Sequence, residues 1–277
     1  MPNAMTQPQH APQARADSVR LRVDALHKRF RLKDRDVIAL GDVSFDVSDH
    51  EFVSLIGPSG CGKSTVLNIA AGLMQASGGA VYLDGERVTR PSPKVGYIFQ
   101  KDTTYPWKTV EENIGMGLEY RGVPAAERQR RVAEMVRMAK LEGFEKAYPA
   151  MLSGGMRQRV ALMRSFIVEP ELLMMDEPFG ALDTHTRLIL HGELLALWQR
   201  TRQVILFVTH DLSEAISLSD RVILLSHRPS RVKAIVDVPI ARPRNVIALR
   251  ESPEYLHIYQ QLWHLLGEEF TFDSEER

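Results

Sequence analysis

The residues with the plainest chemistry form a glycine-rich loop that matches the pattern Gly-x4-Gly-Lys-Ser. An apolar strand is predicted before the loop and a helix after it, so backbone N–H groups and the helix dipole can point at phosphate oxygens. We expect a nucleoside triphosphate here, with Lys63 reaching its β- and γ-phosphates, Ser64 binding Mg²⁺ and Thr65 adding a phosphate contact. The loop comprises Gly57, Pro58, Ser59, Gly60, Cys61, Gly62, Lys63 and Ser64.

Two adjacent carboxylates, Asp176 and Glu177, end a second apolar strand that begins at Leu172. A buried strand holds a carboxylate rigidly, and phosphoryl transfer depends mainly on positioning and charge compensation. Such pairs also occur in ordinary strand-to-loop turns. Their place before Pro178 and downstream of a phosphate loop favours function, with Asp176 holding Mg²⁺ and Glu177 polarising the attacking water.

Cys61 is the only cysteine, which excludes an internal disulfide and a four-cysteine zinc site. Its place inside the loop has two interpretations. It is either a small residue that fits a tight turn, or a redox-active thiol whose pKa is lowered by Lys63 and a helix N-terminus.

A second possible phosphate site lies at Ser153, Gly154 and Gly155, which combine a hydroxyl, bare backbone N–H groups and a helix start. The stretch Leu152-Ser153-Gly154-Gly155-Met156-Arg157-Gln158-Arg159 resembles the signature of the ATP-binding cassette (ABC) family. This resemblance implies an ATPase that closes as a head-to-tail dimer. Each of two ATP molecules is then sandwiched between the phosphate loop of one subunit and the signature of the other.

Three further residues match that family in the same order along the chain. By resemblance, Gln100 is the Q-loop glutamine that touches the Mg²⁺ or the water, and Asp183 belongs to the D-loop that crosses the dimer interface. His210 follows the predicted strand at 204–208 and matches the switch histidine that contacts the γ-phosphate. A lone histidine is more often structural, so the order of the motifs carries this interpretation.

Phe30 is placed like the aromatic residue that stacks on adenine in this family. Stacking tolerates any base, because every base offers a π-face. The alternative interpretation is a core aromatic residue at a strand end.

The predicted elements give an α/β fold with an inserted helical subdomain. The resemblance implies a P-loop NTPase core of the ABC ATPase type with an antiparallel β subdomain. Strands that alternate with helices favour a mostly parallel sheet. We expect a disordered leader at 1–18, an ABC ATPase domain at 19–250 and a C-terminal helix and tail at 251–277. The helical subdomain is expected at about 101–167, with a capping box at Thr109 and Glu112.

The composition argues against a strong nucleic-acid footprint, because 35 basic residues balance 35 acidic ones. We find no apolar run of 18 residues, and the N-terminus lacks the apolar core of a secretory signal. We therefore expect a cytoplasmic, soluble subunit; if it works on a membrane, the membrane part is another polypeptide. The resemblance implies a peripheral position on the cytoplasmic face of the cell membrane.

Within the ABC family the closest likeness is to importer ATPases for taurine, aliphatic sulfonates and nitrate. The segments Tyr105-Pro106-Trp107, 110–113 and 227–232 carry it, although Ser230 replaces the usual glycine and Met163-Arg164-Ser165-Phe166 is bulkier than usual. The resemblance implies a homodimer or paired ATPase subunit, an integral-membrane permease and, indirectly, a periplasmic or extracellular substrate-binding protein, with no nucleic acid. The alternatives are a soluble non-transport ABC ATPase and an exporter ATPase.

Overall fold

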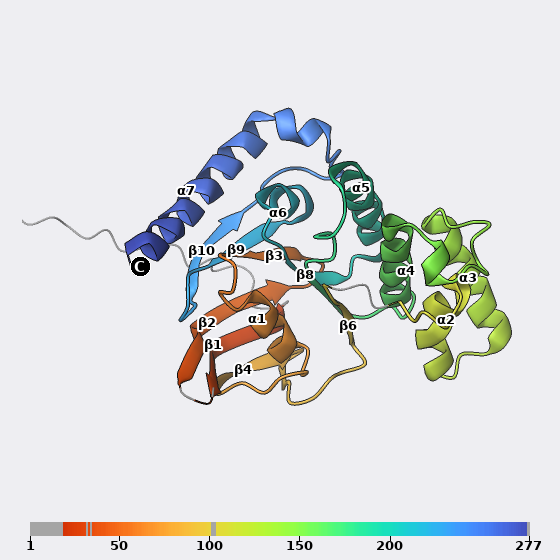
Figure 1. Ribbon diagram of the computed structural model, residues 1–277, viewed down its shortest axis with the longest axis horizontal. Coiled ribbons are helices and arrows are strands. Elements are labelled where there is room, and N and C mark those ends of the chain that lie inside the picture. The colour runs from red at the N-terminus through yellow and green to blue at the C-terminus, as the bar shows by residue number, and fades with distance from the viewer. Residues whose placement is uncertain (1–18, 32, 34, 101–103, 276–277) are drawn as a thin grey trace, which may run out of the picture.

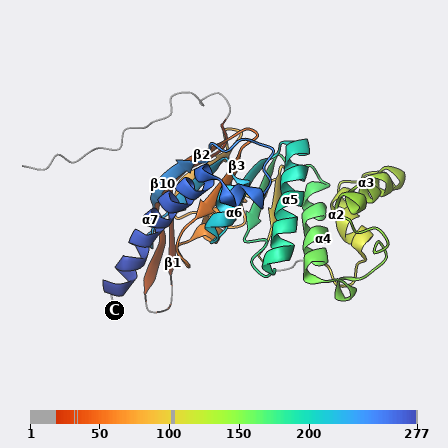
Figure 2. The same cartoon turned by 90° about the horizontal axis from the view of Figure 1, so that it is seen from above.

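The computed structural model describes residues 19–275 apart from 32, 34 and 101–103. The predicted leader at 1–18 and the last two residues lie outside this range. Within it, two β-sheets, the helices around them and a separate group of helices are seen side by side (Figures 1 and 2).

The first sheet is antiparallel and has four strands in the order β2-β1-β4-β5. Two long strands that pair antiparallel make up half of it, β1 (Val19–Arg31) and β2 (Asp36–Ser48). The shorter β4 (Gly78–Leu83) and β5 (Glu86–Arg87) complete it. This sheet corresponds to the expected antiparallel β subdomain.

The second sheet is mostly parallel, with the strand order β10-β9-β3-β8-β7-β6. Its parallel strands are β3 (Phe52–Ile56), β6 (Val95–Ile98), β7 (Leu172–Asp176), β8 (Val204–Val208) and β9 (Arg221–Leu225). The edge strand β10 (Val232–Asp237) pairs antiparallel with β9 and was not predicted. Its mixed polar and apolar residues give only a weak strand signal.

Both faces of the parallel sheet are buried, which explains why its strands read as continuous apolar runs. In β7, Leu172 and Met174 face a core shared with α1 (Lys63–Ala70) and the antiparallel sheet. Leu173 and Met175 face a second core beneath α5 (Thr184–Thr201). A third core lies under α6 (Leu212–Leu218) and the long α7 (Pro253–Glu275), which follows a short 3-10 helix at Ala248–Glu251.

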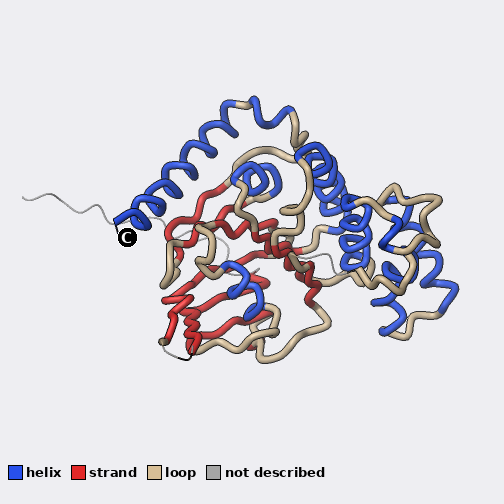
Figure 3. The backbone as a smooth tube through the Cα atoms, viewed as in Figure 1, coloured by secondary structure: helices blue, strands red, loops and turns tan. Residues whose placement is uncertain are grey.

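A group of helices occupies the region between β6 and β7 in the sequence and stands to one side of the sheets (Figure 3). It consists of α2 (Val110–Tyr120), α3 (Ala125–Met138), a 3-10 turn (Pro149–Met151) and α4 (Gly154–Phe166). The capping box predicted at Thr109 and Glu112 begins α2, with both of its hydrogen bonds present. In the described part of the chain, no helix has both the length and the apolar character to cross a membrane.

Candidate functional site

The phosphate loop joins the end of β3 to the start of α1, as the sequence predicts. Gly60 and Gly62 have φ values of +76° and +108°, a region that favours glycine. Lys63 is buried, and its Nζ donates to the carbonyl oxygens of Gly57 and Pro58, at 2.8 and 3.0 Å. A cation is thus fixed inside a curled backbone at a helix N-terminus, which is the arrangement that attracts a phosphate group.

Ser64 and Asp176 meet across 112 residues of sequence, and the Ser64 hydroxyl donates to Asp176 Oδ1 at 2.9 Å. Burial raises the pKa of Asp176, while the Ser64 hydrogen bond opposes that rise. Burial likewise raises the pKa of Tyr97, which lies beside Asp176. These contacts confirm that the first strand-end carboxylate faces the phosphate loop.

Glu177 is the meeting point of two other predicted residues. Its Oε2 accepts a hydrogen bond from Gln100 Nε2 at 3.2 Å and lies 3.1 Å from His210 Nδ1. Glu177 has a φ of +45°, an uncommon conformation for a residue other than glycine. Such backbone strain gathers at functional sites.

Sheet register explains why these side chains meet. Strand β7 lies between β6 and β8, and all three run parallel. Ile98 pairs with Met175 and Asp176 pairs with Val208, so the three strands end at one level. Glu177 comes directly after β7, and Gln100 and His210 come two residues after the ends of β6 and β8, at the edge where ligands bind in open parallel sheets.

The donor set fits Mg²⁺, whose preferred ligands are oxygens. The Ser64 hydroxyl and the Asp176 carboxylate lie in contact, and the amide of Gln100 is joined to this edge through Glu177. Within the described residues, no group of three or more His, Cys, Asp or Glu side chains forms a metal cluster. That sparse set of protein ligands is usual for Mg²⁺, which is commonly held together with substrate phosphates.

The second predicted phosphate site begins α4, which is well separated from α1 in Figure 1. Ser153 caps the helix, since its hydroxyl accepts from the N–H of Met156, and Ser153 and Gly154 are exposed. A Cβ added to Gly155 would lie 2.7 Å from Thr186 Cγ2, so this glycine also permits close packing on α5. The chain therefore does not bring Ser153–Gly155 to its own phosphate loop.

Asp183 lies at the start of α5 and is exposed. Its side chain accepts from the N–H of Thr186 at 3.0 Å, which lowers the pKa of the carboxyl group. Phe30 lies on β1, is half-buried, and carries Lys28 Nζ 5.1 Å from its ring centroid. The structure thus leaves one face of Phe30 in contact with a cation of its own strand.

The redox interpretation of Cys61 is wrong in its physical premise. The thiol is 1% exposed, and burial raises its pKa although Lys63 acts in the opposite direction. A Cβ on Gly57 would lie 3.0 Å from Cys61 Sγ. The small-residue interpretation is the one that the packing supports.

Sequence reasoning did not assign a role to Asn113, which organises the segment before α2. The buried amide accepts from the N–H of Tyr105 at 2.8 Å and donates to the carbonyl oxygens of Tyr105, Lys108 and Thr109. It thereby holds Trp107, which is 69% exposed, on the outside of the helical group. An asparagine four residues after a helix cap was the only signal.

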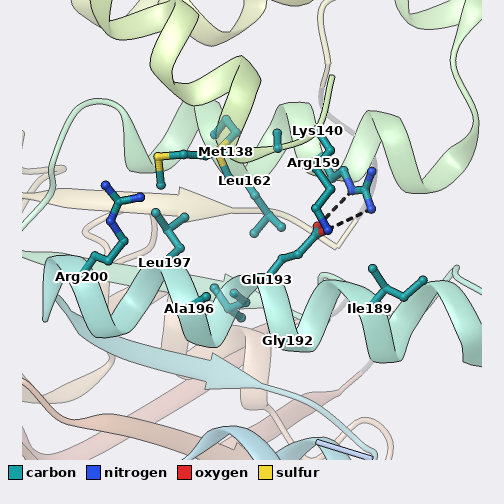
Figure 4. Close-up of a pocket in the computed structure, with 13 residues that line it drawn as sticks. Met138, Lys140, Arg159, Leu162, Ile189, Gly192, Glu193, Ala196, Leu197 and Arg200 are labelled. Atoms are coloured by element: carbon teal, nitrogen blue, oxygen red, sulfur yellow. Dashed lines mark hydrogen bonds and ion pairs between the residues drawn. The ribbon is translucent and has the colours of Figure 1, made fainter. Parts of the chain in front are cut away.

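A separate pocket of about 470 Å³ lies between α4 and α5 and holds none of the predicted site residues (Figure 4). Its walls are mostly apolar, and Glu193 points in from α5 to pair with Arg159 at 3.1 Å and with Lys140 at 3.2 Å. The volume of a cavity therefore does not locate the chemistry of this molecule.

The matching family model describes ABC transporters, and two of the matching relatives are named as ABC transporter or import ATP-binding proteins. Residues 40–180 match the ABC transporter family model. An uncharacterised ABC transporter ATP-binding protein of Methanocaldococcus jannaschii is 45% identical over 91% of this chain and 92% of its own. An aliphatic sulfonates import ATP-binding protein of Bacillus cereus is 43% identical over 80% of this chain and 88% of its own.

Solved structures of dimeric ATP-binding cassettes are similar to this chain. A dimeric ATP-binding cassette in a post-hydrolysis state, bound to ADP and Pi, has a TM-score of 0.71 and 29% identity. The likeness covers 80% of this chain and all of that one. A dimeric bacterial ABC transporter cassette matches with the same TM-score and 30% identity.

Proposed function

Since the chain belongs to the ABC transporter ATP-binding family and is an ATPase of that family, we propose that it powers an importer for a small nutrient. The nutrient class is a sulfonate, taurine or nitrate-like anion, and the chain works at the cytoplasmic face of the cell membrane on a separate permease. Relatives named as aliphatic sulfonate import proteins support this class. The observation that carries the mechanism is the convergence of Gln100 and His210 on Glu177 beside the phosphate loop.

In this mechanism Lys63 and the backbone of the phosphate loop bind the β- and γ-phosphates of ATP, with Thr65 beside them. Ser64, Asp176 and Gln100 hold Mg²⁺, which when bound neutralises phosphate charge. Glu177 accepts a proton from the water that attacks the γ-phosphorus, while Gln100 and His210 keep its carboxylate in place. Phe30 stacks on the adenine.

The second half of each site comes from another subunit. Ser153, Gly154 and Gly155 of one chain contact the γ-phosphate bound by the partner chain, and Asp183 lies at the interface between them. The exposure of Ser153 and Gly154, away from the phosphate loop of their own chain, supports this arrangement. The dimeric cassettes among the structural relatives support it too.

The permease contacts the aromatic segment that follows Gln100. Tyr105 and Trp107 lie 5.4 Å apart between ring centroids, and Arg164 of α4 lies 5.4 Å from the Tyr105 ring. Exposed aromatic groups next to a cation are typical of the centre of a protein interface. A helix of the permease seated here is linked through Gln100 to Glu177.

Replacing Glu177 with Gln tests the mechanism. The variant should bind ATP as the wild type does and lose at least about 100-fold in hydrolysis rate, because an amide cannot take up the proton. ATP binding and phosphate release are the two measurements. Glu86→Gln, an exposed carboxylate on β5, is the matched control. Undiminished hydrolysis by Glu177→Gln would remove the assigned base.

Purification from membranes tests the transport role. The tagged chain should co-elute from detergent-solubilised membranes with a polytopic membrane protein in stoichiometric amount. Trp107→Ala should lose that protein while it keeps ATP binding, and Trp263→Ala, which removes an exposed tryptophan of α7, should retain it. Recovery of the chain without a membrane protein would favour a soluble ABC ATPase instead.

A further inference from the structure

A loop between β9 and β10, which includes part of the segment 227–232 noted above, packs against the phosphate loop and has been given no role in nucleotide binding. It contains Ser226, His227 and Ser230. Ser230 is completely buried, and its hydroxyl donates to the carbonyl oxygen of Cys61 across 169 residues of sequence.

The backbone of Ser230 is held as firmly as its side chain. Its N–H donates to Ala39 of β2 at 3.1 Å, and its carbonyl accepts from Gly41 at 2.9 Å. A Cβ on Gly62 would lie 2.8 Å from Leu40 Cδ2, so β2 touches the phosphate loop as well. Ser230 is thus hydrogen-bonded to β2, a strand that itself packs against the phosphate loop.

The geometry of the peptide unit gives this hydrogen bond a consequence for phosphate binding. The carbonyl of Cys61 and the N–H of Gly62 belong to one planar trans peptide, so they point in opposite directions. A donor that holds the Cys61 carbonyl on the outer side therefore holds the Gly62 N–H toward the inside of the loop. Gly62 has a φ of +108° and no side chain to restrict it, so an outside contact is what limits its rotation.

The same loop is tied to the C-terminal helix. Glu269 of α7 is buried, and its carboxylate accepts from the N–H of His227 at 2.7 Å. It also pairs with Lys233 of β10 at 2.7 Å. These two contacts lower the pKa of Glu269 against the effect of burial, and its charge contributes to the raised pKa of Cys61. The end of α7 is therefore bonded to the same loop that carries Ser230.

We propose that Ser230 is a positioning residue for nucleotide binding, and that Glu269 of α7 holds the loop that carries it. Ser230 touches no phosphate; it orients the Gly62 N–H, which does. The inference rests on the proposed assignment of residues 57–65 as the ATP phosphate loop. It gives the C-terminal helix a part in ATP affinity.

The test measures the Kd of a fluorescent N-methylanthraniloyl ATP, together with kcat and KM, on the purified full-length chain. Ser230→Ala should raise Kd and KM about three- to tenfold, the effect of losing one well-placed hydrogen bond, and change kcat less than about twofold. Ser217→Ala is the matched control. Ser217 is also a buried serine, and its hydroxyl has no hydrogen-bond partner among the described residues.

A serine that only fills space would give a lower melting temperature with an unchanged Kd, and that result would overturn the proposal. If Ser230→Ala does not fold, Ser230→Gly removes the same hydroxyl and should show the same rise in Kd. Lys63→Ala distinguishes a failure of the proposed role of Ser230 from a failure of the phosphate-loop assignment. If Lys63→Ala loses binding while Ser230→Ala binds as the wild type does, only the role of Ser230 fails. If Lys63→Ala also binds normally, the phosphate-loop assignment itself fails.

The link to α7 has its own measurement. Glu269→Ala should raise Kd about two- to fivefold, and the double variant with Ser230→Ala should be affected by less than the product of the two single effects. Residues that act through one shared contact are not additive, whereas independent sites are. A Kd for the double variant equal to the product, or an unchanged Kd in Glu269→Ala, would contradict the link.

Discussion

At the scale of single residues, the residue proposed to bind phosphate and the residue proposed to activate water lie in different environments. Lys63 is buried among backbone carbonyls, whereas Glu177 stands at a strand end with a positive φ and two polar neighbours. Asp176 and Glu177 are adjacent but face different partners, Ser64 and His210. Adjacent carboxylates can thus take different roles because the strand ends between them.

Cys61 gives a prediction at this scale, and its being the only thiol makes the measurement clean. Its raised pKa means that less thiolate is present at any pH near the ordinary value of 9.0. Native protein should therefore react with iodoacetamide at least about 100-fold more slowly at pH 8 than protein unfolded in urea. The native rate should still rise with pH above 9.0, where the unfolded rate levels off.

Two results would contradict that account of Cys61. One is fast labelling of the native chain at pH 8. The other is loss of ATP hydrolysis in Cys61→Ala, since a residue that only fits a tight turn should be replaceable by another small one. The expected activity of Cys61→Ala is within about twofold of the wild type, given that the substitution leaves no polar group unpaired.

At the scale of elements, apolar patterning predicted most of the order of strands and helices. The runs at 52–56, 172–176 and 204–208 are strands because both of their sides are buried. Strand β10 escaped prediction because it lies at a sheet edge and carries Lys233 and Asp237 among its apolar residues. Local apolar patterns reveal strands whose side chains are buried, and an edge strand such as β10 buries few of its side chains.

The candidate site was predicted to the extent that its residues lie at or just beyond strand ends or open helices. Asp176 ends β7 and Glu177 follows it, Gln100 and His210 lie two residues beyond β6 and β8, and the register of neighbouring strands brings them together. The roles of Asn113 and Ser230 were out of reach, because they depend on carbonyl groups that only the folded chain presents to them. No spacing in the sequence encodes the contact of Ser230, and for Asn113 the only signal is its place four residues after a helix cap.

Asn113→Ala is the prediction that belongs to this scale. It should lower the free energy of unfolding by about 2–4 kcal/mol, because the buried Asn113 amide is removed and the partly buried carbonyl and N–H groups of residues 105–109 lose their partner. Urea unfolding measures the change. Asn245→Ala is the control: this exposed asparagine accepts from the N–H groups of Ile247 and Ala248 and should cost about 1 kcal/mol or less. Equal losses in the two variants would show that the Asn113 network contributes little.

At the scale of the whole molecule, the two predicted phosphate-binding segments of one chain lie apart. The phosphate loop precedes α1 and Ser153–Gly155 begin α4, and these two helices are well separated in Figure 1. In the proposed head-to-tail pair of chains, each phosphate loop meets the Ser153–Gly155 segment of the partner chain. The proposed catalytic unit is therefore the dimer. A chain with a defective phosphate loop should then form one intact site when it pairs with a chain that is defective at Ser153–Gly155.

Mixing two inactive variants tests that unit. Lys63→Ala lacks a working phosphate loop, and Gly154→Asp places a negative charge where the γ-phosphate should lie. A Cβ at Gly154 meets nothing closer than 3.8 Å, so the second variant should fold. Each alone should be inactive, while the mixture should recover up to about a quarter of wild-type hydrolysis, because half of the dimers hold one intact site of two. No recovery at all would place both halves of the site within one chain.

Parallel register sets limits on how this chain can change length. Side chains alternate between the two faces of a strand, so one residue inserted within β6, β7 or β8 would turn every later side chain of that strand over. Gln100, Glu177 or His210 would then leave the common edge while the rest of the sheet stayed intact. Insertions in the connections, such as those flanking α3, leave the strand ends level. Relatives with this fold should vary in the lengths of their loops. They should keep a constant number of residues between the end of each of these strands and the site residue that follows it.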